Sequence, residues 1–524
     1  MHVWIKSYNF GKYCTQIQTI NEKITTLNMN KYTFNMKKTI LTILCLIGAL
    51  SINAQEPDEV IADEASTDTT EMPDEDVPMD PIYKYRVYLS DKKGSPYSIS
   101  RPEEFLSARS IERRRKQGLS IDETDIPVNR SYLDKVEKCG VKLIHSSKWN
   151  NTVLVETSDT LLMENVLKLS CVDSIRLAAT YTSLPTIDNS RFDEVENKDQ
   201  VPESKEFFAG IHDDLIERHL KTAYKYGNAY NQIKMLNGIA LHERGYRGQG
   251  MQIAVIDGGF KNVDIIPYFK NVKILGTRDF ALIGGTVYEE EDHGTMVLST
   301  MAGNCRGRII GTAPEASYWL LRSEDGHSEQ LVEEDNWCAA IEFADSVGVD
   351  VVNTSLGYTD YDNDVDDVKY WELDGKTRMI SRSASMAASK GLLLCLSAGN
   401  EASYSRWKLI SPPADASDVL TVGALTPEGE NTYFSSLGNS SDGRIKPDIC
   451  AQGEDCCVVG SNGELRTADG TSFASPITCG MVACYWQAHP EMTVKDVIEQ
   501  LHKNGSYASH PNNVYGWGIP DYSK

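Results

Sequence analysis

The 524-residue chain has little that would place it in a membrane or on nucleic acid. Its longest apolar run, residues 39–50, is shorter than the roughly 20 residues that a membrane-spanning helix needs. Basic residues are scarce, because 52 Lys and Arg stand against 75 Asp and Glu and give a formal net charge of -23. Such a charge repels phosphate backbones, so no nucleic-acid partner is expected.

The sequence also lacks the cysteine patterns of metal centres. None of the twelve cysteines forms a C-x-x-C pair or a Cys/His cluster at zinc spacing, and no metal site is predicted. Their pairing cannot be deduced from the sequence. Cys395, Cys479 and Cys484 lie in apolar or small-residue stretches and are predicted to be buried free thiols.

The N-terminal region predicts export. Residues 36–54 combine two lysines, a short apolar core and small residues before a cut after Ala54, which is typical of a secretory signal peptide. A retained membrane anchor is the alternative. Residues 1–35 carry no motif and are interpreted as a non-native extension, with Met36 as the true start. We expect a periplasmic or extracellular protein without a stable membrane span after signal removal.

An acidic tether follows. Residues 56–80 contain eleven Asp and Glu and no Lys or Arg, interspersed with Pro, Thr and Ser. A segment of this composition buries too little apolar surface to fold by itself. Residues 55–82 are therefore predicted to be a disordered linker.

Residues 83–180 predict a small α+β unit, and residues 181–229 a polar linker with a processing site. The elements expected in the unit are a strand at 83–89, a helix at 102–116, strands at 141–146 and 152–156, a helix at 160–169 and a strand at 172–177.

One basic run, Arg113 to Lys116, ends the first predicted helix of this unit. We interpret it as a solvated face that the helix dipole favours. Contact with nucleic acid is the alternative.

Residues 230–524 predict a larger α/β domain. Short apolar strands at 252–256, 349–352, 391–396 and 419–422 alternate with helical segments. This alternation is typical of a mostly parallel sheet with helices on both faces, whose active sites form at the carboxyl ends of strands.

Three polar residues stand at the ends of elements in this domain. Asp257 ends an apolar strand before two glycines, His293 begins an amphipathic helix, and Ser472 begins another helix. Each by itself is a common turn, helix-start or cap residue. Together they are the groups that acyl transfer needs: a serine nucleophile, an imidazole base and a carboxylate that orients the imidazole.

An oxyanion donor is also available. Asn400 follows the apolar strand 391–396 and a Ser-Ala-Gly segment. Its side-chain NH2 group and the backbone N–H of Ser472 are predicted to hold the negative oxygen that develops during acyl transfer. In isolation, an asparagine after a glycine is more often a turn residue.

These motifs resemble those of the subtilisin-like serine peptidases, the subtilase or peptidase S8 family, over residues 230–524. The matching segments are Val255-Ile256-Asp257-Gly258-Gly259, His293-Gly294-Thr295, Gly399-Asn400, and Gly470-Thr471-Ser472-Phe473-Ala474-Ser475-Pro476. Further matches are Gly311 to Pro314, Val351 to Gly357, Val422 to Ala424, and Lys446 to Ile449.

The resemblance implies a fold and a site. The fold is a three-layer α/β domain with a mostly parallel sheet, preceded by a ferredoxin-like inhibitory propeptide at residues 83–180. The catalytic residues are Asp257, His293 and Ser472, with Asn400 as the oxyanion donor. The implied substrate-binding residues are Ser355, Leu356 and Gly357 together with Ser397, Ala398 and Gly399. A peptide bound there as an additional strand is held by hydrogen bonds to its backbone. Because these bonds do not depend on the peptide's side chains, broad specificity is implied.

The chain also departs from its relatives. Met296 occupies a position where many of them carry a second histidine, and residues 304–310 are shorter than the loop that binds structural calcium in many relatives. No cofactor is expected to be required. The acidic stretch at 360–367 is expected to be a solvated loop, with a weak structural calcium site as the alternative.

The expected function is that of a secreted serine endopeptidase made as a zymogen, with protein or peptide substrates and its own propeptide as partners. An inactive subtilase-like binding scaffold is the alternative. All four positions of the triad and oxyanion donor are filled, which favours the enzyme.

Overall fold

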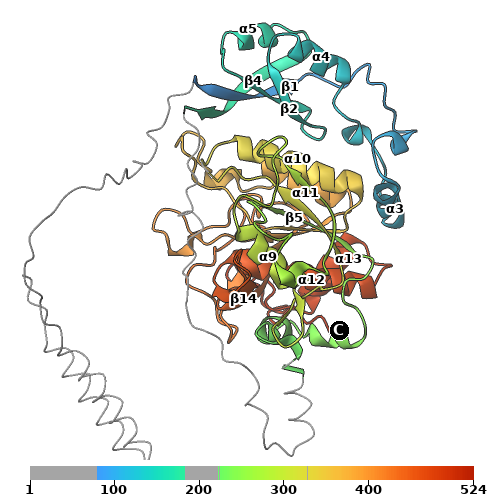
Figure 1. Cartoon of the computed structure of the whole chain (residues 1–524), viewed down its shortest axis with the longest axis vertical. Helices are drawn as coiled ribbons and strands as arrows, with labels where there is room; N and C mark the ends of the chain where they lie inside the picture. The colour runs from blue at the N-terminus through green and yellow to red at the C-terminus, as the bar shows by residue number, and fades with distance from the viewer. Residues whose placement is uncertain (1–79, 183–221, 224, 327) are drawn as a thin grey trace, which may run out of the picture. The chain divides into compact units, whose positions relative to one another are not determined.

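The computed structural model describes residues 80–182, 222–223, 225–326 and 328–524 (Figure 1). These residues all belong to one unit of the chain, Glu75–Lys524. The predicted N-terminal extension and signal peptide lie outside the described residues, as do most of the acidic linker and most of the linker that follows residue 182.

Residues 80–182 form the predicted α+β unit. Its four antiparallel strands lie in the order β2-β3-β1-β4. The elements of this sheet and its two helices are β1 (Ile82–Leu89), α4 (Arg130–Glu137), β2 (Lys142–Ser147), β3 (Thr152–Thr157), α5 (Leu162–Leu167) and β4 (Val172–Tyr181). A small core that includes Val87, Val136 and Val155 joins the sheet to the helices. This order and connectivity confirm the ferredoxin-like prediction.

The helix expected at residues 102–116 is interrupted. A single 3-10 turn, η1 (Pro102–Glu104), precedes α3 (Ala108–Lys116). Ser107 lies between them in an extended conformation, and its side chain accepts a hydrogen bond from Ser110 N at 3.1 Å. This is the geometry of an N-cap residue, so the helix begins after Ser107. A second 3-10 turn, η2 (Glu123–Asp125), follows.

The prediction of a solvated basic face is wrong for half of the run that ends α3. Arg113 and Arg114 are 5% and 1% exposed, whereas Arg115 and Lys116 are exposed. The sequence contains no local signal for this difference, because the carboxylates that receive Arg113 and Arg114 include one more than 200 residues away.

The larger domain is built on a seven-stranded sheet in the order β13-β12-β11-β10-β5-β9-β6, and every pairing within it is parallel. The strands are β5 (Gln252–Asp257), β6 (Lys273–Asp279), β9 (Ser317–Arg322), β10 (Val351–Thr354), β11 (Leu393–Ser397), β12 (Leu420–Leu425) and β13 (Ile449–Gln452). Four of them coincide, within a few residues, with the predicted strands.

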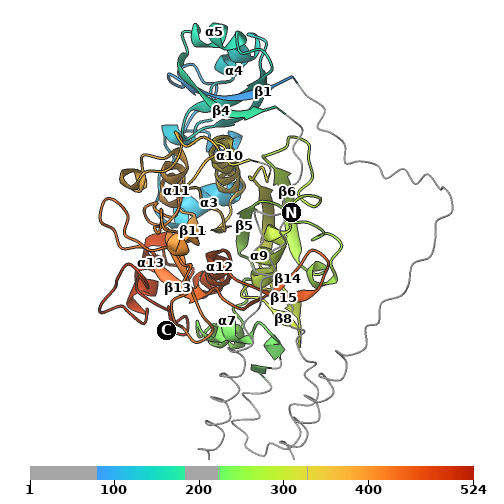
Figure 2. The same cartoon turned by 90° about the vertical axis from the view of Figure 1, so that its left-hand side faces the viewer.

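Helices cover both faces of this sheet (Figure 2). The main ones are α9 (His293–Ala302), α10 (Val332–Val347), α11 (Met379–Ser389), α12 (Thr471–Ala488) and α13 (Val494–Lys503). Two short helices, α7 (Tyr230–Lys234) and α8 (Ile239–Glu243), precede the sheet. Small two-stranded ladders are β7 (Asn304–Cys305) with β8 (Ile309–Ile310) and β14 (Cys456–Val459) with β15 (Leu465–Ala468).

Alternate residues of each central strand enter two separate cores. On β5, Ile253 and Val255 join the core that contains α9 and α12, whereas Ala254 and Ile256 join the core that contains α10 and α11. A strand buried on both faces reads as a continuous apolar run, which is why the sequence predicted it. The result is a three-layer α/β domain, as predicted.

Within the described residues, no helix is long and apolar enough to span a lipid bilayer.

Candidate active site

The candidate site lies where three strands end and two helices begin. Asp257 is the last residue of β5, Ser355 follows β10, and Asn400 lies three residues beyond the end of β11. These three strands are neighbours in the sheet, and their parallel direction brings their carboxyl ends to one edge. His293 is the first residue of α9, and Ser472 is the second residue of α12.

Asp257 and His293 are in direct contact. The distance from His293 Nδ1 to Asp257 Oδ1 is 2.7 Å, and the two residues are 2% and 0% exposed. The same carboxylate oxygen accepts a hydrogen bond from Gly258 N at 2.9 Å. A proton on Nδ1 makes Nε2 the basic nitrogen of the neutral ring, which is the arrangement that general-base catalysis needs.

Gly294 allows this contact. A Cβ atom added at Gly294 would lie 2.3 Å from the carbonyl oxygen of Gly259 and 3.0 Å from Cβ of Asp257. The first turn of α9 can therefore approach the end of β5 only because this residue has no side chain.

Ser472 is held against the end of β10. Its Oγ donates to the carbonyl oxygen of Ser355 at 3.3 Å, and Ser355 Oγ donates to the carbonyl oxygen of Ser472 at 2.8 Å. The neighbouring residue Phe473 has its ring centroid 6.1 Å from that of His293. The starts of α9 and α12 are thus adjacent, and Ser472 is 6% exposed.

Two buried polar residues that the sequence analysis did not assign support Ser355. Asn353 Nδ2 donates to Ser355 Oγ, and Ser475 Oγ donates to Asn353 Oδ1, both at 2.9 Å. Asn353 lies inside the apolar strand β10 and is fully buried. A buried amide in an apolar strand was the available signal, because such a group must find hydrogen-bond partners.

Asn400 is oriented by Thr471. Its Oδ1 accepts hydrogen bonds from the backbone N and the Oγ1 of Thr471, both at 2.9 Å. Thr471 Oγ1 in turn accepts from Gly399 N at 3.1 Å. Because the amide oxygen is occupied, the NH2 group is the end of this side chain that can donate to a substrate.

The residues predicted to bind substrate lie on the loops after two neighbouring strands. Ser355 and Leu356 are each 5% exposed, and Gly357 is exposed. On the other loop Ser397 and Ala398 are buried, and Gly399 has a φ of +104°. The left-handed backbone at Gly399 is one that glycine adopts readily.

Two carboxyl groups close in sequence to His293 and Asn400 have altered acidity. Burial raises the pKa of Glu291, and the neighbouring Asp292 adds to this effect while Arg322 opposes it. Burial likewise raises the pKa of Glu401, whose carboxylate accepts a hydrogen bond from Ser436 Oγ at 2.5 Å. Both groups therefore hold a proton more readily than an exposed glutamate does.

The described part of the chain contains no group of three or more His, Cys, Asp or Glu residues arranged to hold a metal ion. In the acidic stretch at 360–367, Asp366 pairs with Arg176 at 2.6 Å, and Asp367 accepts a hydrogen bond from Tyr361 N at 3.0 Å. The ten cysteines of the described residues are all free thiols.

Comparison with known proteins defines the class. Residues 248–518 match the profile of the subtilase family, Peptidase S8, and the chain therefore belongs to this family of serine-type endopeptidases. Residues 84–195 match a second profile, described as "Peptidase S8 propeptide domain, Bacteroidota". The protein is thus a subtilisin-like serine protease with a propeptide.

The chain is also similar to individual proteins. Subtilisin NAT of Bacillus subtilis subsp. natto is 26% identical over 314 residues, which cover 59% of this chain and 73% of the relative. Serine protease AprX of Bacillus subtilis (strain 168) is 28% identical over 307 residues, which cover 52% of this chain and 65% of the relative. Among solved structures, the prenylagaramide maturation protease PagA aligns with a TM-score of 0.44 at 21% identity, covering 54% of this chain and 95% of that chain.

Proposed function

We propose that the protein is an exported serine endopeptidase, made as a zymogen, that cleaves peptide bonds with Asp257, His293 and Ser472. The observation that carries the proposal is the buried 2.7 Å contact between Asp257 and His293, next to the helix start that presents Ser472.

In the proposed reaction, Ser472 Oγ attacks the carbonyl carbon of the scissile bond while His293 Nε2 takes the hydroxyl proton. The imidazolium that forms is stabilised by Asp257, which keeps its negative charge. His293 then gives the proton to the leaving amine, and an acyl-enzyme remains. Water attacks this ester by the same route in reverse, with His293 again acting first as base and then as acid.

The oxyanion of each tetrahedral intermediate is proposed to accept hydrogen bonds from Asn400 Nδ2 and the backbone N–H of Ser472. The N-terminus of α12 adds a favourable dipole at this position. Support for this role comes from the two hydrogen bonds with which Thr471 holds the amide oxygen of Asn400.

Protein or peptide substrates are proposed to lie between the loops 355–357 and 397–399 as an added strand. Backbone hydrogen bonds of this kind depend little on side chains, so broad specificity is expected.

The propeptide, residues 83–180, is proposed to act as an inhibitor until the chain is cut between residues 180 and 230. No cofactor takes part in the proposed reaction, and chelation with EDTA is expected to leave the rate of cleavage unchanged.

The deciding experiment is active-site labelling with a fluorophosphonate probe. After the linker has been cut and the propeptide removed, the protein is expected to be labelled on Ser472, and Ser472→Ala treated in the same way is expected to abolish labelling. Thr478→Val, which alters another buried hydroxyl residue of the same helix, is the matched control and should keep the label. A folded peptidase domain that has been freed of the propeptide and takes no label at Ser472 would indicate an inactive scaffold and overturn the proposal.

Export and maturation have their own test. N-terminal sequencing of protein recovered from the periplasm and the medium is expected to find chains that begin after Ala54 and mature chains that begin between residues 180 and 230. An active protein that retains residues 83–180 in the same chain would contradict the zymogen proposal.

A further inference from the structure

The basic run at the end of α3 has no part in the proposed chemistry, yet two of its arginines are almost completely buried. Arg114 Nη2 donates to Asp345 at 2.9 Å and to Asp125 at 2.8 Å, and Arg113 Nη2 donates to Asp345 at 2.5 Å. Asp345 lies near the end of α10 in the peptidase domain and is fully buried.

A third cation completes this cluster. Lys148, from the loop after β2, donates to Asp345 Oδ2 at 2.9 Å. Burial by itself would raise the pKa of Asp345, but Lys148, Arg113 and Arg114 together hold it below its usual value. All three cations belong to the propeptide.

The same segment hydrogen-bonds the backbone where α10 ends. Ser107 N donates to the carbonyl oxygen of Ser346, and Arg109 Nε donates to that of Gly348, both at 2.9 Å. Arg113 Nη1 donates to the carbonyl oxygen of Val349 at 2.6 Å. The last carbonyls of a helix have no partner within the helix, and cations there also complement the helix dipole.

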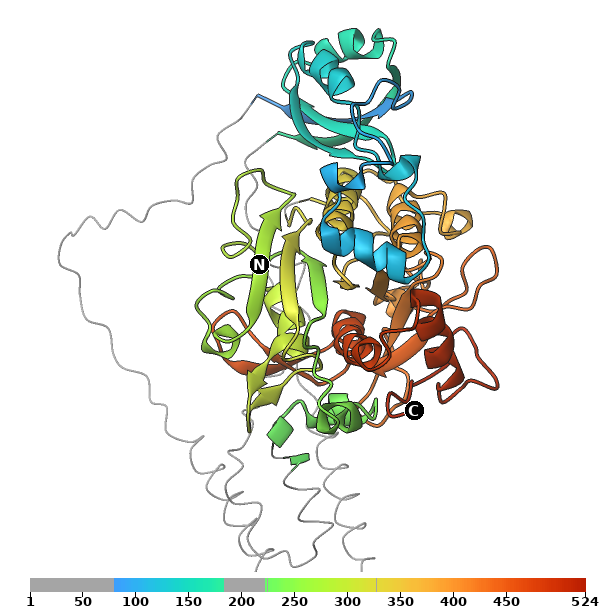
Figure 3. The same ribbon diagram turned by 90° about the vertical axis from the view of Figure 1, so that its right-hand side faces the viewer.

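The end of α11 is held in a similar way. Gln117 Nε2 donates to the carbonyl oxygen of Gly391 at 2.8 Å. Lys390 Nζ donates to Asp122 at 2.9 Å and to Asp125 at 3.0 Å. Residues 107–125, here called the arginine clasp, therefore connect the ends of the two helices that cover one face of the sheet (Figure 3).

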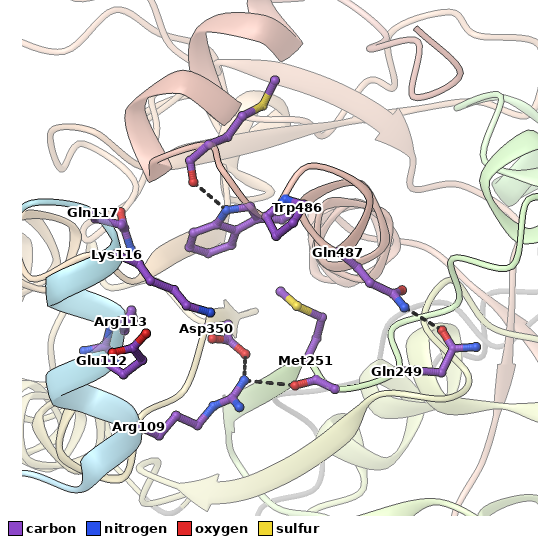
Figure 4. A pocket seen from close by; sticks show the side chains of 13 residues that line it. Arg109, Glu112, Arg113, Lys116, Gln117, Gln249, Met251, Asp350, Trp486 and Gln487 are labelled. Carbon is purple, nitrogen blue, oxygen red and sulfur yellow. Dashed lines mark hydrogen bonds and ion pairs between the residues drawn. The ribbon is translucent and has the colours of Figure 1, made fainter.

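The contact is polar. The side chains that α3 buries are Ser110, Arg113 and Arg114, and none of them is apolar. On its other side, α3 borders a cavity of about 310 Å³ whose far wall includes Trp486 and Met492. Figure 4 shows Lys116 extending from α3 into this cavity. The clasp thus holds the propeptide on the peptidase domain through ion pairs and through hydrogen bonds to backbone carbonyl oxygens.

The clasp and the end of the propeptide reach opposite edges of the sheet. The clasp contacts residues 346–350 and 390–391, which lead into the amino ends of β10 and β11. The end of β4 contacts the segment after β9, where Thr180 N donates to Gln330 Oε1 at 2.8 Å and Tyr181 OH donates to Asp325 at 2.6 Å. Only the second attachment lies at the carboxyl edge, where the candidate active site is.

We propose that the arginine clasp is a second anchor that keeps the propeptide bound to the peptidase domain after the linker is cut, independently of what occupies the active site. The groups that it binds are Asp345 and backbone carbonyl oxygens at or just after the ends of α10 and α11, and the groups that bind them are mainly Arg113 and Arg114 of α3. The biological consequence rests on the proposed zymogen function: the clasp adds to the contacts that Arg86 makes with Asp335 and that Leu154 makes with the core around α10 and α11, and it slows release of the cut propeptide.

The test uses the full chain with Ser472→Ala and a recognition sequence for a site-specific protease placed within residues 183–221. After this added cut, dissociation of the propeptide is measured by size-exclusion chromatography over a range of protein and salt concentrations. Because the chain's own catalysis is not involved, the outcome does not depend on whether the proposed protease activity is correct.

The double variant Arg113→Ala/Arg114→Ala is expected to raise the dissociation constant at least about 100-fold, since truncating one side of a buried ion pair leaves a carboxylate uncompensated. Arg115→Ala is the matched control, because Arg115 is exposed and pairs with Glu112 of its own helix at 2.6 Å. The control should behave like the parent chain. Equal dissociation of the double variant and the control, with both folded by circular dichroism, overturns the proposal.

A milder variant keeps the test decisive if the double alanine variant does not fold. Arg113→Lys/Arg114→Lys retains both charges but loses the forked hydrogen bonds, and a roughly 10-fold increase in the dissociation constant is expected. In the uncut chain, hydrogen exchange at residues 345–350 should be faster in this variant than in Arg115→Ala. Unchanged dissociation and unchanged exchange would refute the clasp.

Discussion

Ser472 and Ser355 hold each other by a reciprocal pair of hydrogen bonds, in which each side-chain hydroxyl donates to the other residue's backbone carbonyl oxygen. This pair links the first turn of α12 to the end of β10. It therefore sets the position of the proposed nucleophile relative to the edge of the sheet.

The first prediction concerns this link. Ser355→Ala removes the donor to the Ser472 carbonyl and the acceptor of Asn353 Nδ2. A loss of roughly 10-fold in kcat is expected, which corresponds to about 1.4 kcal/mol, the size of one hydrogen bond. Steady-state hydrolysis of a chromogenic peptide measures the effect. Ser389→Ala on the exposed end of α11 is the control, and a Ser355→Ala enzyme with unchanged kcat would show that the link is dispensable.

The second prediction concerns Asp257. Asp257→Asn keeps the size of the side chain but no longer stabilises the imidazolium or the required tautomer of His293. In a serine protease triad this change lowers kcat by about 10⁴-fold, and a similar loss is expected here. The thermal unfolding midpoint should change little. Asp360→Asn in an exposed loop serves as the control, and a loss smaller than about 10-fold in Asp257→Asn would argue against the assigned role.

The third prediction concerns the orientation of Asn400. Thr471→Val removes the hydroxyl that donates to Asn400 Oδ1 and accepts from Gly399 N. We expect kcat to fall about 10-fold with little change in KM, because the oxyanion forms only in the transition state. Thr471→Ser restores the hydroxyl and should restore kcat. If Thr471→Val instead raises KM and leaves kcat unchanged, Thr471 acts in substrate binding and not in stabilising the transition state.

The fourth prediction concerns Gly294. A methyl group at this residue would lie 2.3 Å from the Gly259 carbonyl oxygen, which belongs to the backbone and cannot move as a side chain can. Gly294→Ala is expected to displace His293 and to lower fluorophosphonate labelling by at least about 100-fold, since small misplacements of catalytic groups are costly. Gly460→Ala controls for the loss of a glycine as such, because the atoms nearest to a methyl group there belong to the side chains of Asn462 and Arg466, 3.2 Å or more away. Normal labelling of Gly294→Ala would mean that α9 accommodates the added methyl group without displacing His293.

The fifth prediction concerns acid stability. His242 is 4% exposed, its Nδ1 lies 2.9 Å from Tyr226 OH, and its Nε2 lies 2.9 Å from the Thr312 carbonyl oxygen. Burial lowers the pKa of His242 to about 4. The folded state therefore holds this ring neutral, so its contribution to stability is complete above about pH 6.5, the pKa in the unfolded chain, and is lost progressively as the pH falls toward 4.

The expected loss from this one group is about 3 kcal/mol in the free energy of unfolding. Urea denaturation of the Ser472→Ala chain between pH 7 and pH 4.5 measures it. His242→Gln should show a flatter dependence on pH than the parent, and His510→Gln, at an exposed histidine, should not. Parallel pH profiles for all three proteins would exclude His242 as the source.

Much of the fold could be predicted because its signals are local. The central strands are buried on both faces, so each is a short apolar run, and four of the seven were predicted. The strands β6, β9 and β13 were not predicted. Three residues of the edge strand β6 are exposed, including Lys273, so this strand has no continuous apolar run.

The sequence by itself determined which chemical groups this protein has and where they stand on its elements: a carboxylate at a strand end, a histidine and a serine at helix starts, and an asparagine after a glycine. Only the tertiary structure decided which of them touch. Three contacts join segments that are far apart in the chain: His293 with Asp257, Ser475 with Asn353, and Arg113 with Asp345. The physical reason is that a hydrogen bond requires two atoms to lie within a few ångströms of each other. For residues far apart in the chain this distance is set by the packing of the three layers, and local sequence patterns do not reveal it.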